Sequence, residues 1–218
     1  MFSVSPWLCG KSESAQMNST VIIDYGMGNL RSVEKALETV GGHPVISGDR
    51  EVVRTSQRLI LPGVGAFGDA MLNLKRTDLE AAVREAVEKG TPLLGLCLGL
   101  ELLFSESEEF GRHEGLNLIP GKVKKFEEPD LRVPHVGWNQ IESLRPDPLL
   151  EGIKDGAYFY FVHSFYVEPA NPEDALAWTH YGSRFCSIAR RGNVWGAQFH
   201  PEKSQDAGKQ LLRNFLAT

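Results

Sequence analysis

The stretch TPLLGLCLGLELLF (residues 91–104) joins a continuous apolar run to a helical pattern through a single turn. The run predicts a strand buried on both faces. Gly95 and Gly99 flank Cys97 in the G-x-nucleophile-x-G arrangement of a nucleophile elbow, where a strand turning at once into a helix leaves no room for side chains at the glycine positions. The helix N-terminus favours a thiolate, and the N–H of Leu98 points where an oxyanion would form. Alone, the pattern equally fits a buried cysteine beside a tight turn.

The residues before this elbow alternate between strand and helix patterns. TVIID (20–24) and RLILPG (58–63) are short buried strands. Residues 30–40 carry apolar side chains on one helical face and stop at two glycines, and LEAAVREAVEKG (79–90) is an amphipathic helix ending at a glycine. Fully apolar strands alternating with helices predict a parallel sheet covered by helices on both faces.

From about residue 121 the pattern changes to short strands separated by turn residues, which indicates antiparallel additions to the sheet. The expected strands lie in KVKKF (122–126), HVGWNQIE (135–142), AYFYFVHSFYV (157–167), ALAWTH (175–180), FCSIARR (185–191) and VWGAQF (194–199). A final helix follows, with Ser204 as its expected N-cap. Its inward face is predicted to hold Ala207, Leu211, Leu212 and Phe215. We therefore expect a three-layer α/β/α fold whose central, mostly parallel sheet is extended by antiparallel strands.

Composition limits the classes of function. The 218 residues fit one domain, with residues 1–18 a Ser-rich extension expected to be disordered and residues 19–218 the folded domain. The net charge of −5 gives no reason to expect nucleic-acid binding. Three scattered cysteines suit a reducing, cytoplasmic location better than a disulfide framework. No apolar run is long enough to span a membrane, and the N-terminus does not read as a signal peptide.

Two further motifs fit the chemistry of an activated cysteine. In Phe199-His200-Pro201-Glu202, extended backbone places His200 and Glu202 on one face, so that the carboxylate orients the imidazole and the imidazole serves Cys97 as general base. As an isolated tripeptide, His-Pro-Glu is more often only a strand end. Leu61-Pro62-Gly63-Val64-Gly65 follows a strand and is able to offer the Val64 N–H as a second oxyanion donor.

These pieces, in this order, resemble the class I, triad-type glutamine amidotransferases. Within that family the chain is most similar to the glutaminase subunits of imidazole glycerol phosphate synthases, from about residue 20 to the end. The segments that carry this resemblance are IIDYGMGNLRSV, LPGVGAFGDAM, GLCLGLELLFSESEEFG, VPHVGWNQI, YFYFVHSFYV and AQFHPEKSQDAG.

The resemblance implies a mechanism and a partner. Cys97 would attack the side-chain amide of L-glutamine to form a glutamyl thioester, with His200 moving the proton and Glu202 orienting His200. Val64 and Leu98 would form the oxyanion hole once the PGVG loop rearranges. The ammonia would enter the channel of a (β/α)₈ cyclase subunit in a heterodimer, which makes imidazole glycerol phosphate for histidine synthesis and an aminoimidazole carboxamide ribotide. No cofactor or metal is implied.

The resemblance also assigns contacts. The implied glutamine contacts are Gly65, Glu101, Glu109, His163 and Ser164, and the implied interface residues are Met27, Asn29, Trp138, Asn139, Tyr160 and Lys203. Trp138 and Tyr160 equally suit core positions, and Lys203 a solvated helix start. Position 101 departs from the family, which usually has glutamine there. A carboxylate accepts hydrogen bonds but does not donate an N–H, and it would repel the substrate carboxylate unless it were protonated.

Three alternatives remain open from the sequence. One is a glutaminase subunit of another synthase, for pyridoxal phosphate or aminodeoxychorismate, which assays with the acceptor substrate would separate. Another is a stand-alone elbow-cysteine hydrolase or redox chaperone. Such proteins place a histidine soon after the cysteine, whereas Leu98, Gly99 and Leu100 follow here. The third is a non-catalytic binding module, which the intact Cys97 argues against.

Overall fold

The computed structural model describes residues 20–127, 131–143 and 145–218, and the expected disordered extension at residues 1–18 lies outside them. Half of the main sheet is parallel. Its strands run in the order β2 (Pro44–Ser47), β1 (Thr20–Ile23), β3 (Arg58–Gly63), β4 (Leu93–Cys97) and β14 (Val194–Ala197). Every pairing among these five is parallel. Because each parallel crossover returns over a face of the sheet, helices cover both sides, as the sequence predicts.

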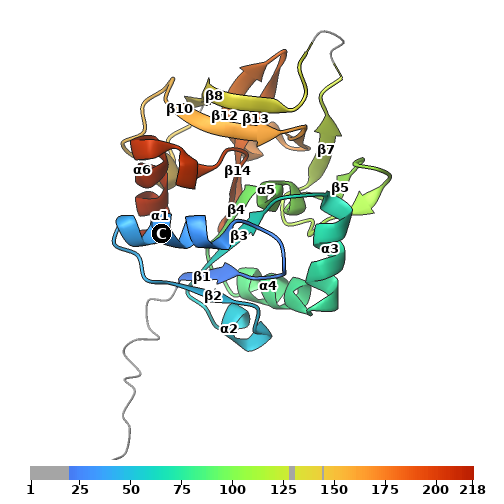
Figure 1. The fold of residues 1–218 in the computed structure, drawn as a ribbon, viewed down its shortest axis with the longest axis vertical. Coiled ribbons are helices and arrows are strands. Elements are labelled where there is room, and N and C mark those ends of the chain that lie inside the picture. Colours follow the sequence, from blue (N-terminus) through green and yellow to red (C-terminus); the bar gives the residue numbers. More distant parts are fainter. Residues whose placement is uncertain (1–19, 128–130, 144) are drawn as a thin grey trace, which may run out of the picture.

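The helices divide between the two faces (Figure 1). One face packs against α1 (Leu30–Thr39) and α6 (Gln205–Leu216). The other packs against α2 (Arg50–Arg54), α3 (Phe67–Arg76), α4 (Leu79–Glu88) and α5 (Leu98–Leu102). Strand β3 shows how one apolar run serves both cores, since Ile60 joins the first cluster while Leu59 and Leu61 join the second.

The other half of the main sheet is largely antiparallel. Beyond β14 come β13 (Ser183–Arg191), β11 (Phe165–Pro169), β7 (Gly121–Lys125), β5 (Glu106–Ser107) and β6 (His113–Glu114), and off this path lie β12 (Ala175–Tyr181) and β9 (Glu142–Ser143). Only β5 and β7 pair in parallel in this half of the described sheet. The described chain also contains three short 3₁₀ helices: η2 (Pro148–Leu150), η3 (Pro172–Asp174) and η4 (Pro201–Lys203).

Strands β8 (His135–Gln140) and β10 (Tyr158–His163) correct one expectation, because they do not extend the main sheet. They pair with each other as a separate two-stranded ribbon, which lies at the end of the molecule near β12 (Figure 1). The inward side chains Phe159 and Phe161 join the core that contains α1 and α6. Alternating polarity predicts which face of a strand is buried, but not which strand it pairs with.

Ser204 is the N-cap residue of α6 by position, as expected, but its hydroxyl makes no capping bond to that helix. Instead the hydroxyl donates to the carbonyl oxygen of His200 at 2.6 Å and accepts from the backbone N–H of Tyr160 at 3.0 Å. The inward face of α6 is as expected, with Leu211, Leu212 and Phe215 buried and Ala207 packed against the same core. No helix in the described part of the chain is long and apolar enough to cross a membrane.

Candidate functional site

Cys97 stands at the junction of β4 and α5 with φ 55° and ψ −113°, a conformation that costs energy for any residue with a side chain. The flanking glycines make the turn possible. A Cβ on Gly95 would lie 2.5 Å from the carbonyl oxygen of Gly99, and one on Gly99 would overlap the carbonyl oxygen of Leu61. The glycine-flanked pattern thus folds as the elbow that the sequence predicts, with the Cys97 side chain at the mouth of a helix.

A cavity of about 470 Å³ lies over the elbow. It collects residues that are far apart in sequence, from the loop after β3, from α5 and from the end of β10. Predicted site residues that line it are Val64, Gly65, Cys97, Leu98, Glu101, Glu109, His163, Ser164, His200 and Lys203. Residues that the sequence analysis did not select also line it, namely Phe110, Lys125, Pro134, Val162 and Phe165.

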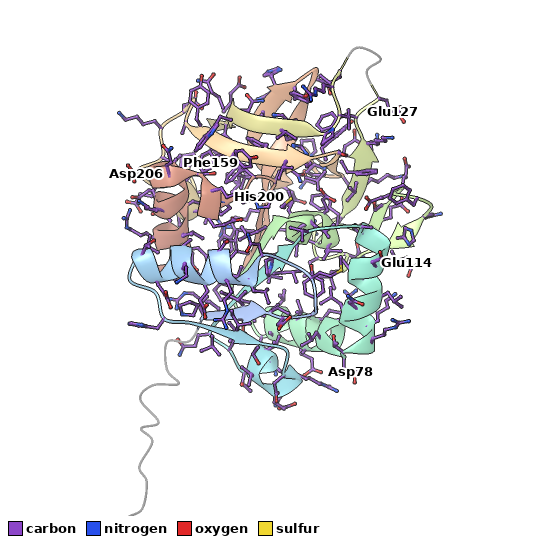
Figure 2. All side chains as sticks on the ribbon, in the orientation of Figure 1. Asp78, Glu114, Glu127, Phe159, His200 and Asp206 are labelled. Atoms are coloured by element: carbon purple, nitrogen blue, oxygen red, sulfur yellow. The ribbon has the colours of Figure 1, made fainter. Side chains whose placement is uncertain are left out.

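His200, which lines this cavity, is brought together with Glu202, but not by the extended backbone that the sequence analysis expected, because Pro201–Lys203 form η4 and His200 is its N-cap. The Nδ1 atom of His200 lies 2.8 Å from Oε1 of Glu202, and both side chains are almost fully buried. Figure 2 shows His200 in the interior of the molecule, whereas Asp206 lies at its edge. A carboxylate facing Nδ1 fixes the proton there and leaves Nε2 with a free lone pair. Among the described residues, that Nε2 atom is buried and has no hydrogen-bond partner.

The thiol of Cys97 is held in its protonated form. Burial raises its pKa well above the usual range, a negative charge on Glu101, when that group is ionised, raises it further, and the backbone N–H of Leu98 lowers it. The Sγ atom contacts the carbonyl oxygen of Val162 at 3.9 Å. A buried thiol of this kind becomes a nucleophile only when a base removes its proton. His200 is a residue with a basic side chain that lines the same cavity as Cys97.

Glu109 fixes the segment that follows the LPGVG loop. Its Oε2 accepts the backbone N–H of Phe67, the first residue of α3, at 2.6 Å. Gly65, two residues earlier, has a φ of +100°, which favours glycine. A Cβ at this position would also lie 2.8 Å from the terminal carbon of Met27. The carboxylate of Glu109 therefore has a role in holding the cavity wall as well as lining it.

His163 is engaged at both ring nitrogens. Its Nδ1 lies 2.7 Å from the carbonyl oxygen of Phe165, and its Nε2 lies 2.9 Å from Nδ1 of His135. The carbonyl only accepts, so His163 carries its proton on Nδ1 and accepts at Nε2 from His135. The Nε2 of His135 then accepts from the amide of Asn139 at 3.3 Å. Burial lowers the pKa of His163 to about 3 and that of His135 to about 4, so both rings are neutral.

Of the expected interface residues, Lys203 lines the cavity, whereas Met27, Asn29, Trp138, Asn139 and Tyr160 do not. Trp138 is 46% exposed on β8, and its ring meets that of Tyr160 edge-on at 6.1 Å. The Nζ atom of Lys203 lies 5.7 Å from the centroid of the Tyr160 ring. Asn29 is exposed and lines a small cavity together with His200 and Glu202. Trp138 is therefore a surface residue of the ribbon, and the alternative that it belongs to the core is wrong.

Gln198 is a residue of this site that sequence reasoning missed. It is fully buried, and its Nε2 donates to Oε1 of Glu101 at 2.9 Å. The available signal was its spacing, because it lies two residues before His200 in extended chain and so shares a face with it. Nothing in the sequence indicates that its partner is Glu101, 97 positions away.

Comparison with known proteins agrees with this geometry. The family model described as glutamine amidotransferase class-I matches residues 21–218. The imidazole glycerol phosphate synthase subunit HisH of Moorella thermoacetica is 51% identical over 199 residues, covering 91% of this chain and 94% of that protein. The HisH subunit of Methanosarcina barkeri is 50% identical, covering 92% and 98%.

Solved structures share the fold at low identity. A structure titled as a crystal structure of glutamine amidotransferase superposes with a TM-score of 0.72 at 22% identity, covering 91% of this chain and 97% of the other. The structure of PurLQS from Thermotoga maritima gives a TM-score of 0.73 at 19% identity with the same coverage. At this level of identity the likeness concerns the fold alone.

Proposed function

Because this chain belongs to the class-I glutamine amidotransferase family, we propose that it hydrolyses L-glutamine at Cys97 as the glutaminase subunit of an imidazole glycerol phosphate synthase. The observation that carries the proposal is that Cys97, at the elbow, and His200 line a single cavity, while Nε2 of His200 has no hydrogen-bond partner among the described residues. About 50% identity to HisH subunits over about nine-tenths of the chain supports the choice of synthase.

The reaction follows from the proton positions. Nε2 of His200 takes the Cys97 proton while the sulfur attacks the side-chain carbonyl carbon of glutamine, and the imidazolium is stabilised by Glu202. The tetrahedral intermediate collapses as the carbon–nitrogen bond breaks, and His200 gives its proton to the departing ammonia. Water, activated by the same base, then attacks the thioester and releases glutamate and the thiol.

The oxyanion of each tetrahedral intermediate needs donors that face the reacting carbon. The backbone N–H of Leu98 is one, since it follows the nucleophile at the start of α5 and already interacts with the Cys97 sulfur. We assign the second to the N–H of Val64, in the loop that ends β3. The neighbouring Gly65, with its positive φ, gives this loop the freedom to turn that N–H toward the cavity.

The partner that we propose is a (β/α)₈ cyclase subunit, in a one-to-one heterodimer. The outer face of the β8–β10 ribbon supports this, because Val136, Trp138 and Tyr158 expose 57, 46 and 55% of their surface. These side chains form an apolar face beside the glutamine cavity, and such faces mark interaction sites. Ammonia passing directly into the partner stays unprotonated and reaches the nucleotide from which imidazole glycerol phosphate and the ribotide form. The described free thiols Cys97 and Cys186 suit a cytoplasmic location.

Reconstitution tests the proposed function. The purified chain and a cyclase subunit are supplied with the nucleotide substrate and either glutamine or an ammonium salt, separately and together. We expect glutamine-dependent imidazole glycerol phosphate only when both subunits are present, whereas the ammonium salt suffices for the cyclase alone. A mixture that uses ammonia but never glutamine contradicts the assignment, and assays with acceptors of other synthases then identify the pathway.

Trp138→Ala is expected to weaken binding of the cyclase subunit by about 10- to 100-fold, because exposed tryptophans near the centre of an interface often dominate its affinity. Stability should change little, since the side chain is half exposed. Titration calorimetry or fluorescence anisotropy measures the dissociation constant. Val45→Ala is the matched control, because Val45 is also 46% exposed but lies on the opposite edge strand β2. Equal affinities for the two variants would place the interface elsewhere.

A further inference from the structure

Glu101 is a carboxyl group placed one helical turn after the nucleophile. It lies in α5, is only 5% exposed, and lines the glutamine cavity together with Cys97. Carboxyl groups are rarely buried without a cation to pair with them. The described ion pairs of the chain do not include Glu101. Its environment therefore disfavours the ionised form.

The contacts of Glu101 determine where a proton would sit. Oε1 accepts the N–H of Gln198 at 2.9 Å, so that oxygen already has a donor. Oε2 has no hydrogen-bond partner within the described chain. It is not one of the fully buried atoms that lack a partner there, so it is accessible to a small molecule. A neutral carboxyl in this position carries its proton on Oε2. It then presents one donor to the cavity, as the N–H of a side-chain amide would.

The ionisable groups around Glu101 set its charge. The groups that line the same cavity are Cys97, Glu109, Lys125, His163, His200 and Lys203. Burial is the main cause that raises the pKa of Glu101 to about 8, the hydrogen bond from Gln198 opposes the rise, and Glu109 adds to it. The carboxyl is thus mostly neutral near pH 7, and the geometry and the electrostatics agree.

We propose that Glu101 acts as an uncharged carboxylic acid whose O–H donates a hydrogen bond to an oxygen of bound glutamine. The inference rests on the proposed glutaminase function and assigns this residue as a substrate-positioning donor. Loss of the proton would remove the donor and place a negative charge beside both the substrate and the sulfur. Because the charge on Glu101 also raises the pKa of the Cys97 thiol, ionisation would make the thiolate harder to form.

The sign of the pH dependence follows. The neutral form predominates below about pH 8 and the carboxylate above it. Wild-type kcat/KM for glutamine should therefore fall relative to that of Glu101→Gln, which keeps a donor at every pH. The ratio of the Glu101→Gln value to the wild-type value removes the titration that the two proteins share. It should be flat below about pH 7 and rise about tenfold per pH unit above about pH 8.5.

The experiment measures this ratio in the complex with the cyclase, with the ammonia-dependent rate as a control for the partner. Glu108→Gln is the matched control, because it makes the same change at a glutamate that is exposed and does not line the cavity, so its ratio to wild type should stay flat. Gln198→Leu removes the hydrogen-bond donor that favours the carboxylate of Glu101. In this variant, the fall of kcat/KM with rising pH should therefore begin at a higher pH than in the wild type. Parallel pH profiles for wild type and Glu101→Gln, or a folded but inactive Glu101→Gln, would overturn the proposal.

Infrared spectroscopy keeps the test independent of activity. The wild type at pH 7 should show the C=O stretch of a protonated carboxyl that is missing from Glu101→Gln and that disappears as the pH rises through about 8. If the complex never hydrolyses glutamine, the proposed function fails while this band still decides the state of Glu101. If glutamine is hydrolysed but the band is absent at pH 7, the proposal about Glu101 fails alone.

Discussion

Cys97→Ala abolishes the glutamine-dependent reaction of the complex, with an expected loss in kcat/KM of at least about 10⁴-fold, and leaves the ammonia-dependent reaction of the cyclase unchanged. The reason is that, of the two cysteines in the described part of the chain, only Cys97 lines the cavity. The replacement should not unfold the chain, because alanine and cysteine have the same backbone requirements. Steady-state assays with each nitrogen source in parallel measure the effect.

Cys186→Ala is the matched control for this result. Cys186 is the other described free cysteine and is fully buried in β13, where its thiol donates to the carbonyl oxygen of Ile188. We expect it to lose some stability and to keep glutaminase activity. A glutamine-analogue electrophile should label the wild type and Cys186→Ala but not Cys97→Ala. Retained glutamine-dependent activity in Cys97→Ala would remove Cys97 from the mechanism.

Gly99→Ala is expected to lower the free energy of unfolding by at least about 3 kcal/mol, or to prevent folding altogether. The added Cβ would overlap the carbonyl oxygen of Leu61 in β3, and that strand has no room to move because Leu61 is fully buried. Relief requires α5 to shift away from the sheet, which would also displace Cys97. Urea denaturation followed by circular dichroism measures the change.

Gly41→Ala separates this clash from ordinary glycine effects. Gly41 has a φ of +87°, but a Cβ there meets nothing within 4 Å. Its replacement should cost only about 1 kcal/mol of backbone strain. If Gly99→Ala were no more destabilising than Gly41→Ala, the close approach of α5 to β3 would not be what the elbow requires.

The parts of the fold that the sequence predicted are those set by local chemistry. The glycines around Cys97 are dictated by one turn. The contact between His200 and Glu202 is also local, although it is made across the start of the 3₁₀ helix η4 and not along extended backbone. Apolar runs such as β3 and β4 predicted a parallel sheet because only a strand covered on both faces has that composition. For these features, the deciding interaction lies within a few residues of the motif.

The parts that the sequence did not predict depend on long-range partners. The ribbon formed by β8 and β10 has the same alternation as a strand of the main sheet, and only tertiary pairing distinguishes the two. Ser204 has the residue type and position of an N-cap, yet bonding to Tyr160 and His200 uses its hydroxyl. The contact between Gln198 and Glu101 likewise depends on bringing β14 beside β4.

Tyr160 joins the ribbon to the segment that carries His200 through two main-chain hydrogen bonds. Its N–H donates to the hydroxyl of Ser204, and its carbonyl oxygen accepts the N–H of His200 at 2.9 Å. These two hydrogen bonds do not depend on the side chain at position 160, so the surface of the ribbon is free to diversify over evolutionary time without losing them. Proline at position 160 is the exception. It has no N–H, so the hydrogen bond to the hydroxyl of Ser204 would be lost.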